Sequence, residues 1–342
     1  MKTPVVLMVD DIQVKTAMDA AEAECRERQI RVERYPDMDA LAADSAALQV
    51  ADMLIVSSNF PCTRAIMQAA PQLRAVIFPA SGTETIDLAA AEDLSIVVGH
   101  GADPENAESM AEATIMFVLV LLYDLHKSER LLRSGQPRPE KLYARMLKGR
   151  TIGLIGFGRI GRAIAVRLQN WGASIVAFSP NIGEKDLPPG VRTAELDDLI
   201  RQSDVVCIVC ALTEQTRGMI DAQKLGLLKS SAVLVNVSRG AVVDEQALYE
   251  ATKNEKIARI ACDTFVVEPL PANSPLRQLN NAILTPHIVG HTRDAIDAGS
   301  RTLIESVLRV LAGRPPTHVR NPEVMPAWQA KWEGAPRLVA SD

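Results

Sequence analysis

The sequence predicts an α/β protein with two Rossmann-like, doubly wound parallel-sheet domains. Short apolar runs typical of strands alternate with helical segments along most of the chain. A glycine-rich turn near the middle begins a second series of such alternations. The length of 342 residues exceeds what one hydrophobic core usually serves. We therefore expect two domains, each with helices covering a sheet of parallel strands.

The amino-terminal third contains the elements of the first sheet. Expected strands are 5–9, 30–35, 53–57, 73–79 and 96–98, and expected helices are 14–28, 39–48, 64–69 and 86–92. A longer helix opens at Asp103-Pro104-Glu105, because proline suits a first helical turn and acids suit the positive end of the helix dipole. Its segment 115–120 is apolar on every face, which predicts a helix buried on all sides, in a dimer or between the domains.

The glycine-rich turn follows a polar connector, 134–149. Gly156, Gly158 and Gly161 form G-x-G-x-x-G, in which the glycines permit a tight turn, close approach of the backbone to a diphosphate, and close helix packing. The pattern alone is weak, but an apolar strand precedes it and an amphipathic helix, expected to extend to Gly172, follows. The context predicts a dinucleotide site at the amino end of that helix, against the alternative of a ligand-free strand-turn-helix.

The residue expected to face the adenosine ribose is Ser179, eighteen residues after Gly161 and directly after the strand 174–178. A carboxylate in this region favours NAD, because it binds the ribose hydroxyls. Serine does not repel a 2′-phosphate, yet the following Pro180 and Asn181 supply no arginine to bind one. The sequence therefore predicts NAD or NADP without choosing between them.

Further strands are expected near residues 174, 205, 233, 257 and 283. An amphipathic helix over 292–311 follows, with Gly313-Arg314-Pro315 as its stop. Because the last segment is too small for another domain, it is expected to return to the first sheet. The predicted division is a discontinuous, flavodoxin-like substrate domain, 1–101 and 292–342, and a dinucleotide-binding domain, 102–291.

Composition excludes several classes of function. Lys and Arg total 37 against 42 for Asp and Glu, with no basic cluster, so nucleic-acid binding is not expected. The most apolar stretch, 113–123, is short for a membrane span, so no membrane partner is expected. Five cysteines without a regular framework favour a reducing, cytoplasmic compartment. Cys207 and Cys210 are expected on opposite faces of one strand, so no metal site is predicted.

Three polar residues follow expected strands of the second sheet: Arg239, Glu268 and His287. The carboxyl ends of parallel strands line the ligand crevice of a doubly wound sheet. Arginine can bind a carboxylate through two donors, histidine can exchange a proton near neutral pH, and an ionised glutamate favours the imidazolium. The alternative is a surface arginine, a solvated glutamate and a capping histidine.

These residues stand in motifs that resemble the D-isomer-specific 2-hydroxyacid dehydrogenase family. The similar segments are Gly-Phe-Gly-Arg-Ile-Gly, Asn-Val-Ser-Arg-Gly-Ala-Val-Val-Asp, Asp-Thr-Phe-Val-Val-Glu-Pro-Leu-Pro, Thr-Pro-His-Ile-Val-Gly-His-Thr, Ser-Gly-Thr-Glu-Thr-Ile-Asp and Asn-Ala-Glu-Ser-Met-Ala-Glu. The resemblance extends from about residue 50 to residue 325. It implies an NAD(P)-dependent oxidoreductase acting on a small 2-keto or 2-hydroxy acid, a homodimer, and an active-site cleft between the domains.

The resemblance also implies a role for each site residue. Arg239 would bind the substrate carboxylate and polarise the carbonyl, His287 would act as the acid and base, and Glu268 would orient and charge it. Substrate would also contact Ser81, Gly82 and Asn106. The dinucleotide would contact Gly156, Gly158, Arg159, Ile160, Gly161, Ser179, Cys210, Ala211, Val237, Ser238, Asp263 and Gly290.

Three departures from the family pattern leave the substrate and the cofactor preference open. No Trp occurs near Gly135-Gln136-Pro137, the usual Gly-x-Gly is Ala80-Ser81-Gly82, and Ser179 replaces an acid. A second functional hypothesis is an NAD(H)-sensing, corepressor-like interaction protein, although long low-complexity flanks are lacking. The formate dehydrogenase branch is disfavoured, because it resembles this chain but has Gln where Glu268 stands.

Overall fold

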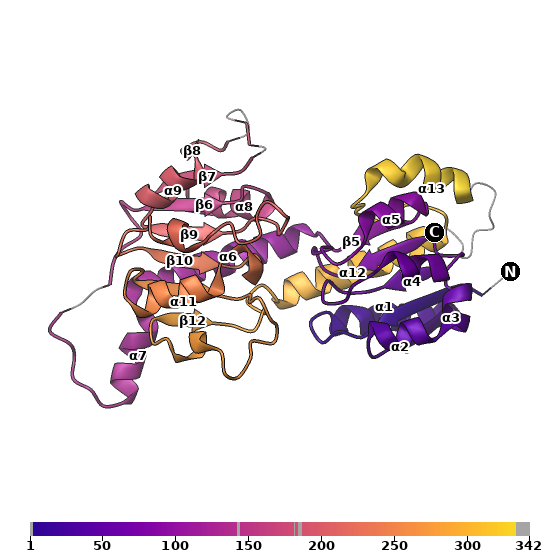
Figure 1. Cartoon of the computed structure of the whole chain (residues 1–342), viewed down its shortest axis with the longest axis horizontal. Coiled ribbons are helices and arrows are strands. Elements are labelled where there is room, and N and C mark those ends of the chain that lie inside the picture. The colour runs from indigo at the N-terminus through magenta and orange to yellow at the C-terminus, as the bar shows by residue number, and fades with distance from the viewer. Residues whose placement is uncertain (1–2, 142–143, 181, 184–186, 333–342) are drawn as a thin grey trace. The chain divides into compact units, whose positions relative to one another are not determined.

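The computed structural model describes residues 3–141, 144–180, 182–183 and 187–332 (Figure 1). The chain divides into two compact units: unit 1 contains the residues up to Asn106 and from His291, and unit 2 is Ala107–Gly290. The first division falls in the opening turn of α6 (Pro104–Tyr123), a few residues beyond the limit of 101 expected from the sequence. Asn181 and the tail 333–342 lie outside the described residues.

Unit 1 contains a five-stranded parallel sheet in the order β2-β1-β3-β4-β5. The strands are β1 (Val5–Val9), β2 (Arg31–Tyr35), β3 (Met53–Ile55), β4 (Ala75–Phe78) and β5 (Val97–His100). Both faces of the sheet are buried: Leu7 packs in one apolar cluster, whereas Val6 and Met8 pack in another. The strand order reverses between β1 and β3, which is the position at which doubly wound sheets usually bind a ligand.

The helices on one face of this sheet differ from the sequence prediction at one point. They are α2 (Met38–Ala43), α3 (Ser45–Val50), α4 (Arg64–Ala69) and α5 (Leu88–Asp93). The prediction of a single helix over 39–48 is wrong, because the helical conformation is interrupted at Asp44. The Asp44 side chain accepts a hydrogen bond from the Ala47 amide at 3.0 Å and so begins a new helix.

The opposite face of the sheet is covered by α1 (Lys15–Glu27), α12 (Arg293–Leu311) and α13 (Met325–Trp332). The return of α12 to the first sheet was predicted, and the helix is followed by Gly313 at φ +76°. Helix α13 was not predicted. Its Trp328 side chain is 1% exposed, and the indole N–H donates to the Arg74 carbonyl at 2.8 Å. This segment of the tail is therefore part of the core of unit 1.

Unit 2 contains a seven-stranded parallel sheet in the order β12-β11-β10-β9-β6-β7-β8. Its strands are β6 (Thr151–Ile155), β7 (Ser174–Phe178), β8 (Val191–Thr193), β9 (Val205–Ile208), β10 (Val233–Asn236), β11 (Arg259–Cys262) and β12 (Ala282–Leu284). The short edge strand β8 was missed in the sequence, where its three residues include no strongly apolar run. The strand order reverses between β6 and β9, at the glycine-rich turn.

Helices cover both faces of the unit 2 sheet, with α6 and α8 (Arg159–Leu168) on one and α9 (Leu196–Gln202) and α11 (Glu245–Lys253) on the other. The prediction that α8 extends to Gly172 is wrong: α8 ends at Leu168, and Trp171 lies beyond it, 43% exposed. Helix α10 (Ala222–Leu225) is a single turn. Helix α7 (Leu125–Arg133), also not predicted, stands away from the sheet of unit 2 (Figure 1).

Helix α6 is 20 residues long with a mean hydropathy of 1.3, so by length and composition it could cross a membrane. Half of that segment is buried within the protein, as is usual for the core helix of an α/β domain. Burial on all sides is not found in the single chain, because Met116 and Tyr123 are about half exposed. The exposed side of α6 thus contains large apolar residues.

The burial of Trp328 predicts its contribution to stability. Trp328→Ala removes a large side chain from the core and leaves the Arg74 carbonyl without its indole donor, so it is expected to destabilise unit 1 by about 3–5 kcal/mol. Trp171→Ala, the matched control at an exposed position, is expected to cost less than about 1 kcal/mol. Denaturant unfolding monitored by circular dichroism measures both, and equal losses would contradict the assignment.

Candidate functional site

The glycine-rich turn after β6 has the shape of a phosphate-binding loop. Gly156 has φ +101°, and a Cβ there would lie 2.6 Å from the Cys210 backbone at the end of the neighbouring β9. A Cβ at Gly161 would lie 2.6 Å from the Gly156 carbonyl oxygen. By contrast, a Cβ at Gly158 would meet nothing within 4 Å. The turn is therefore packed closely against the sheet and leaves open space at the amino end of α8, which fits a diphosphate.

The other residues expected to contact a dinucleotide lie around this turn, in loops at the carboxyl edge of the sheet. Arg159 and Ile160 begin α8, and Ser179 directly follows β7. Cys210 and Ala211 follow β9, and the Ser238 hydroxyl, after β10, donates to the Cys210 carbonyl. The structure thus brings together loops that are far apart in the sequence.

The two cysteines near this edge lie in different surroundings. Cys207 is buried in β9, and its burial raises the pKa of the thiol to about 12. Cys210 lies beyond the end of the strand, rather than on it as expected. Among the residues that the structure describes, no group of three or more His, Cys, Asp or Glu side chains could hold a metal ion.

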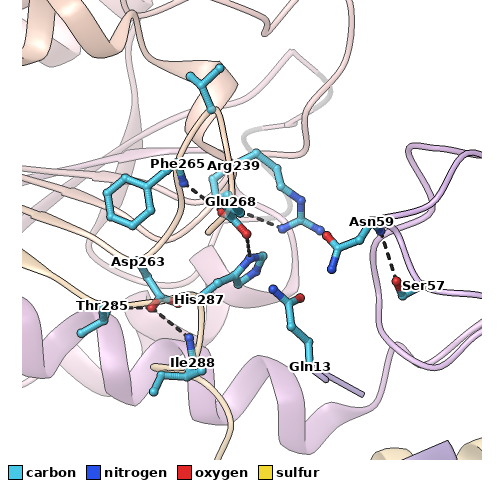
Figure 2. Close-up of polar contacts among 12 residues, drawn as sticks. Gln13, Ser57, Asn59, Arg239, Asp263, Phe265, Glu268, Thr285, His287 and Ile288 are labelled. Carbon is cyan, nitrogen blue, oxygen red and sulfur yellow. Dashed lines mark hydrogen bonds and ion pairs between the residues drawn. The ribbon is translucent and has the colours of Figure 1, made fainter. Parts of the chain in front are cut away.

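His287 and Glu268 form a hydrogen-bonded pair (Figure 2). His287 Nδ1 lies 2.7 Å from Glu268 Oε2, and Glu268 Oε1 accepts a hydrogen bond from the Phe265 amide at 2.9 Å. Both side chains are about one-fifth to one-quarter exposed. The pairing fixes the ring plane and leaves Nε2 as the nitrogen available to a ligand.

The environment of Glu268 favours its ionised form. Burial acts to raise the pKa of the carboxyl group, but the hydrogen bonds from His287 and Phe265 and the nearby charges of His287 and Arg239 outweigh burial. The net result is a pKa below the ordinary value for glutamate. An ionised Glu268 can stabilise a positive charge on the imidazole.

Arg239 directly precedes a 3₁₀ turn, Gly240–Val242, after β10. Its Nη1 donates to the Ser238 carbonyl at 2.9 Å, and its own carbonyl accepts from the Asn236 side chain at 3.2 Å. A Cβ at Gly240 would lie 2.0 Å from the Phe265 carbonyl carbon. Glycine at this position therefore allows the loop that presents Arg239 to pack against the loop that presents Glu268.

Asp263 and Gly290 lie on either side of the His287 loop. The Asp263 side chain is 1% exposed and accepts hydrogen bonds from the Thr285 hydroxyl at 2.6 Å and the Ile288 amide at 3.1 Å. The Gly290 carbonyl accepts from the Ser109 hydroxyl at 2.9 Å. Both residues were predicted as dinucleotide contacts, and this role stays a prediction.

In unit 1, the expected substrate residues follow β4 and β5. Ser81 is exposed, and its hydroxyl contacts the Gly101 carbonyl at 3.2 Å and Asn106 Oδ1 at 3.5 Å, while Gly82 is buried. A second group of polar residues follows β1 and β3. It consists of Asp11, Gln13, Ser57 and Asn59. The two acids after an apolar strand, Asp10 and Asp11, were the available sequence signal.

The two sheets and the glycine-rich loop after β6 define an α/β protein of the dinucleotide-binding class, and comparisons with known proteins give the family. Residues 115–289 match the NAD binding domain of D-isomer specific 2-hydroxyacid dehydrogenases. A glyoxylate reductase from Thermofilum pendens is 34% identical over 266 residues, which cover 76% of this chain and 78% of that protein. The chain therefore belongs to the D-isomer specific 2-hydroxyacid dehydrogenase family.

Two further relatives define the extent of the similarity. A D-3-phosphoglycerate dehydrogenase from Methanocaldococcus jannaschii is 32% identical over 79% of this chain, which spans only 52% of that relative's length. The crystal structure of an NADPH-dependent glyoxylate/hydroxypyruvate reductase from Sinorhizobium meliloti, in complex with NADP and malonate, has a TM-score of 0.82. It is 28% identical, and the match covers 93% of this chain and 97% of that chain.

Proposed function

We propose that this protein transfers a hydride between NAD(P)H and the C2 carbonyl of a small 2-keto acid, giving the D-2-hydroxy acid. The observation that supports this most directly is the 2.7 Å pair between His287 and Glu268, next to the charge of Arg239, in a member of this family. Unit 2 would bind the dinucleotide and unit 1 would contribute substrate contacts.

His287 would supply the proton for reduction. With Nδ1 bound to Glu268, the proton on Nε2 passes to the carbonyl oxygen, and the imidazolium becomes neutral imidazole. The dinucleotide held by unit 2 would supply the hydride that is added to C2. In the reverse direction, neutral Nε2 accepts the hydroxyl proton, and ionised Glu268 stabilises the resulting charge.

Arg239 would bind the substrate carboxylate through its planar guanidinium, and another N–H of the same guanidinium would polarise the C2 carbonyl of the substrate. Ser81, Gly82 and Asn106 would complete the contacts to the substrate. The dinucleotide would contact the residues of the glycine-rich turn and the loops after β7, β9, β10, β11 and β12.

A homodimer formed through α6 and α7 is part of this proposal. Helix α7 has no buried residue, and Leu125 and Leu132 are 54% and 82% exposed. With Met116 and Tyr123 on α6, they leave a large amount of apolar surface on unit 2.

The five cysteines are all unpaired, which agrees with a reducing cytoplasmic compartment.

Replacement of Arg239 tests the carboxylate contact. Arg239→Ala is expected to lower kcat/KM by about 10²–10⁴-fold, because the oriented charge for the carboxylate is lost, with the dinucleotide Kd changed less than about threefold. Arg201→Ala, which removes a half-exposed arginine from α9, is the control and should retain activity. Steady-state kinetics and dinucleotide fluorescence titration measure both, and an undiminished rate in Arg239→Ala would remove this residue from the mechanism.

The His287–Glu268 pair predicts a pH dependence. Reduction uses the imidazolium, so its kcat/KM should fall with rising pH while oxidation rises over the same interval. Glu268→Gln keeps the shape of the side chain but removes the charge that stabilises the imidazolium, so the falling limb of reduction should move to lower pH. Full pH profiles of wild type and variant measure this, and a limb that stays in place or moves upward would exclude Glu268 as the partner.

The exposed apolar residues predict the oligomeric state. Light scattering at micromolar concentration is expected to give twice the chain mass of 37.1 kDa. Leu132→Glu should shift the protein towards the monomer, because a charge cannot be buried in an apolar interface without a partner. Val50→Glu, at an exposed apolar position on α3 of unit 1, should leave the dimer intact. A monomeric wild type would contradict the proposed homodimer.

A further inference from the structure

A cavity of about 760 Å³ lies in unit 2, at the amino edge of its sheet. Val233 and Arg259, the first residues of β10 and β11, both line it. The loops proposed to bind the dinucleotide follow the carboxyl ends of these strands, so a strand of four residues, about 13 Å long, separates them from the cavity. The volume is typical of a site for a small molecule. The proposed reaction gives this cavity no role.

Cationic side chains dominate the wall of the cavity. Five cations line it, against the two carboxylates of Asp124 and Glu255. The cations are Lys127 and Arg130 of α7, Arg145, Lys253 at the end of α11, and Arg259. Because the whole chain has a net charge of −5, the excess of positive charge is local. The five residues come from four separate segments, which is why the sequence shows no basic cluster.

Two of the arginines are held in place by contacts with the protein. Arg259 Nη2 lies 2.6 Å from Asp124 Oδ2, and these side chains are 18% and 17% exposed. Arg130 Nη2 donates to the Asn280 carbonyl at 3.1 Å. A guanidinium has five N–H donors, so one contact fixes each group without using all of its donors. With Asp124 neutralised by Arg259, the other four cations share the cavity with one carboxylate, Glu255.

The segment after α7 brings Arg145 to the same cavity. The Arg145 amide donates to the Leu122 carbonyl at 2.9 Å, near the end of α6, and its side chain is exposed. Ser230, Ser231 and Asn281 add neutral hydrogen-bonding side chains to the wall. Arginines together with neutral donors suit phosphate and carboxylate oxygens, each of which accepts more than one hydrogen bond. The chemistry of the wall therefore favours an anion.

The cationic side of α7 differs from the apolar side that is proposed to form the dimer. At about 100° per residue, Leu125 and Leu132 lie within roughly 20° of one another around the helix. Lys127 and Arg130 lie about 140–160° away from both leucines. The cavity and the proposed dimer thus use opposite sides of α7, so dimerisation through the leucines would leave the cavity accessible.

We propose that this cavity binds a small, multiply charged anion, with Arg130, Arg145 and Arg259 as its principal contacts. The ligand class is a molecule with two or more phosphate or carboxylate groups, because a single negative charge would leave most of the cations uncompensated. The cavity lies at the other end of the strands from the residues proposed for hydride transfer. Its ligand is therefore not the substrate, and it should bind together with the dinucleotide.

Calorimetric titration with inorganic pyrophosphate and with citrate tests the site. The full-length protein is titrated at about 0.15 M chloride in the presence of saturating NADH or NADPH, which keeps pyrophosphate away from the glycine-rich turn. At least one probe is expected to bind with a Kd of about 0.1 mM or less. Acetate, which has one charge, should bind at least about tenfold more weakly. The tighter of the two probes identifies the preferred anionic group.

Three variants locate the bound anion. Arg130→Ala and Arg145→Ala each remove one charged donor from an exposed position of the cavity wall, so each should raise the Kd of the tighter probe by about tenfold. Arg133→Ala is the matched control, because it removes the same charge from α7 outside the cavity wall. It should change the Kd less than about twofold. Circular dichroism checks that each variant is folded.

Three results would overturn this inference. The first is no binding of either probe up to roughly 10 mM. The second is an equal loss of affinity in Arg133→Ala and Arg145→Ala, which would show attraction by general surface charge. The third is release of the probe by added dinucleotide, which would assign its binding to the glycine-rich turn. All three leave the proposed dehydrogenase activity unaffected, and a protein without that activity would still be expected to bind the anion.

Discussion

The buried carboxyl group of Asp263 is the interaction on which the arrangement of the candidate site depends. It joins the end of β11 to the loop after β12 through the Thr285 hydroxyl and the Ile288 amide, and the Asp263 carbonyl accepts from the His287 amide at 2.8 Å. His287 has φ +56°, a conformation that costs a residue with a side chain about 1–2 kcal/mol. The bonds to Asp263 offset that cost and direct the imidazole towards Glu268.

Close packing of backbones is the second constraint. At Gly240, a side chain would collide with the Phe265 backbone, whose amide donates to Glu268. At Gly156, a side chain would collide with Cys210. In both cases a Cβ would separate two loops that follow neighbouring strands. Arg239 and Glu268 can therefore act on one another only because the residue between their loops is glycine.

The sequence was sufficient for the parts of the fold and site that follow from periodicity and chain order. Arg239, Glu268 and His287 could be identified together because each follows an apolar run, and parallel strands end at one edge. The contacts of Asp263 could not be identified, since its partners lie more than twenty residues away on another strand's loop.

The errors in the predicted secondary structure have a common cause. At these positions the local sequence is compatible with more than one structure, and tertiary packing selects one of them. The break between α2 and α3 depends on which of several acids caps a helix, and only the Asp44 hydrogen bond identifies it. Helix α13 is short and has no clear apolar period, yet Trp328 is buried because the sheet of unit 1 has a face to cover. Packing, rather than intrinsic propensity, determines both.

The strand order reverses once in the sheet of each unit, but the polar groups at the two reversals are of opposite kinds. In unit 2, the reversal of strand order between β6 and β9 exposes backbone N–H groups and a helix amino terminus, which suit an anion. In unit 1, the reversal between β1 and β3 presents oxygen acceptors organised by Asp11, with no Lys or Arg in the adjoining segments. In the proposed reaction, the negative charge of the substrate would then depend on Arg239, because the loops of unit 1 cannot neutralise it.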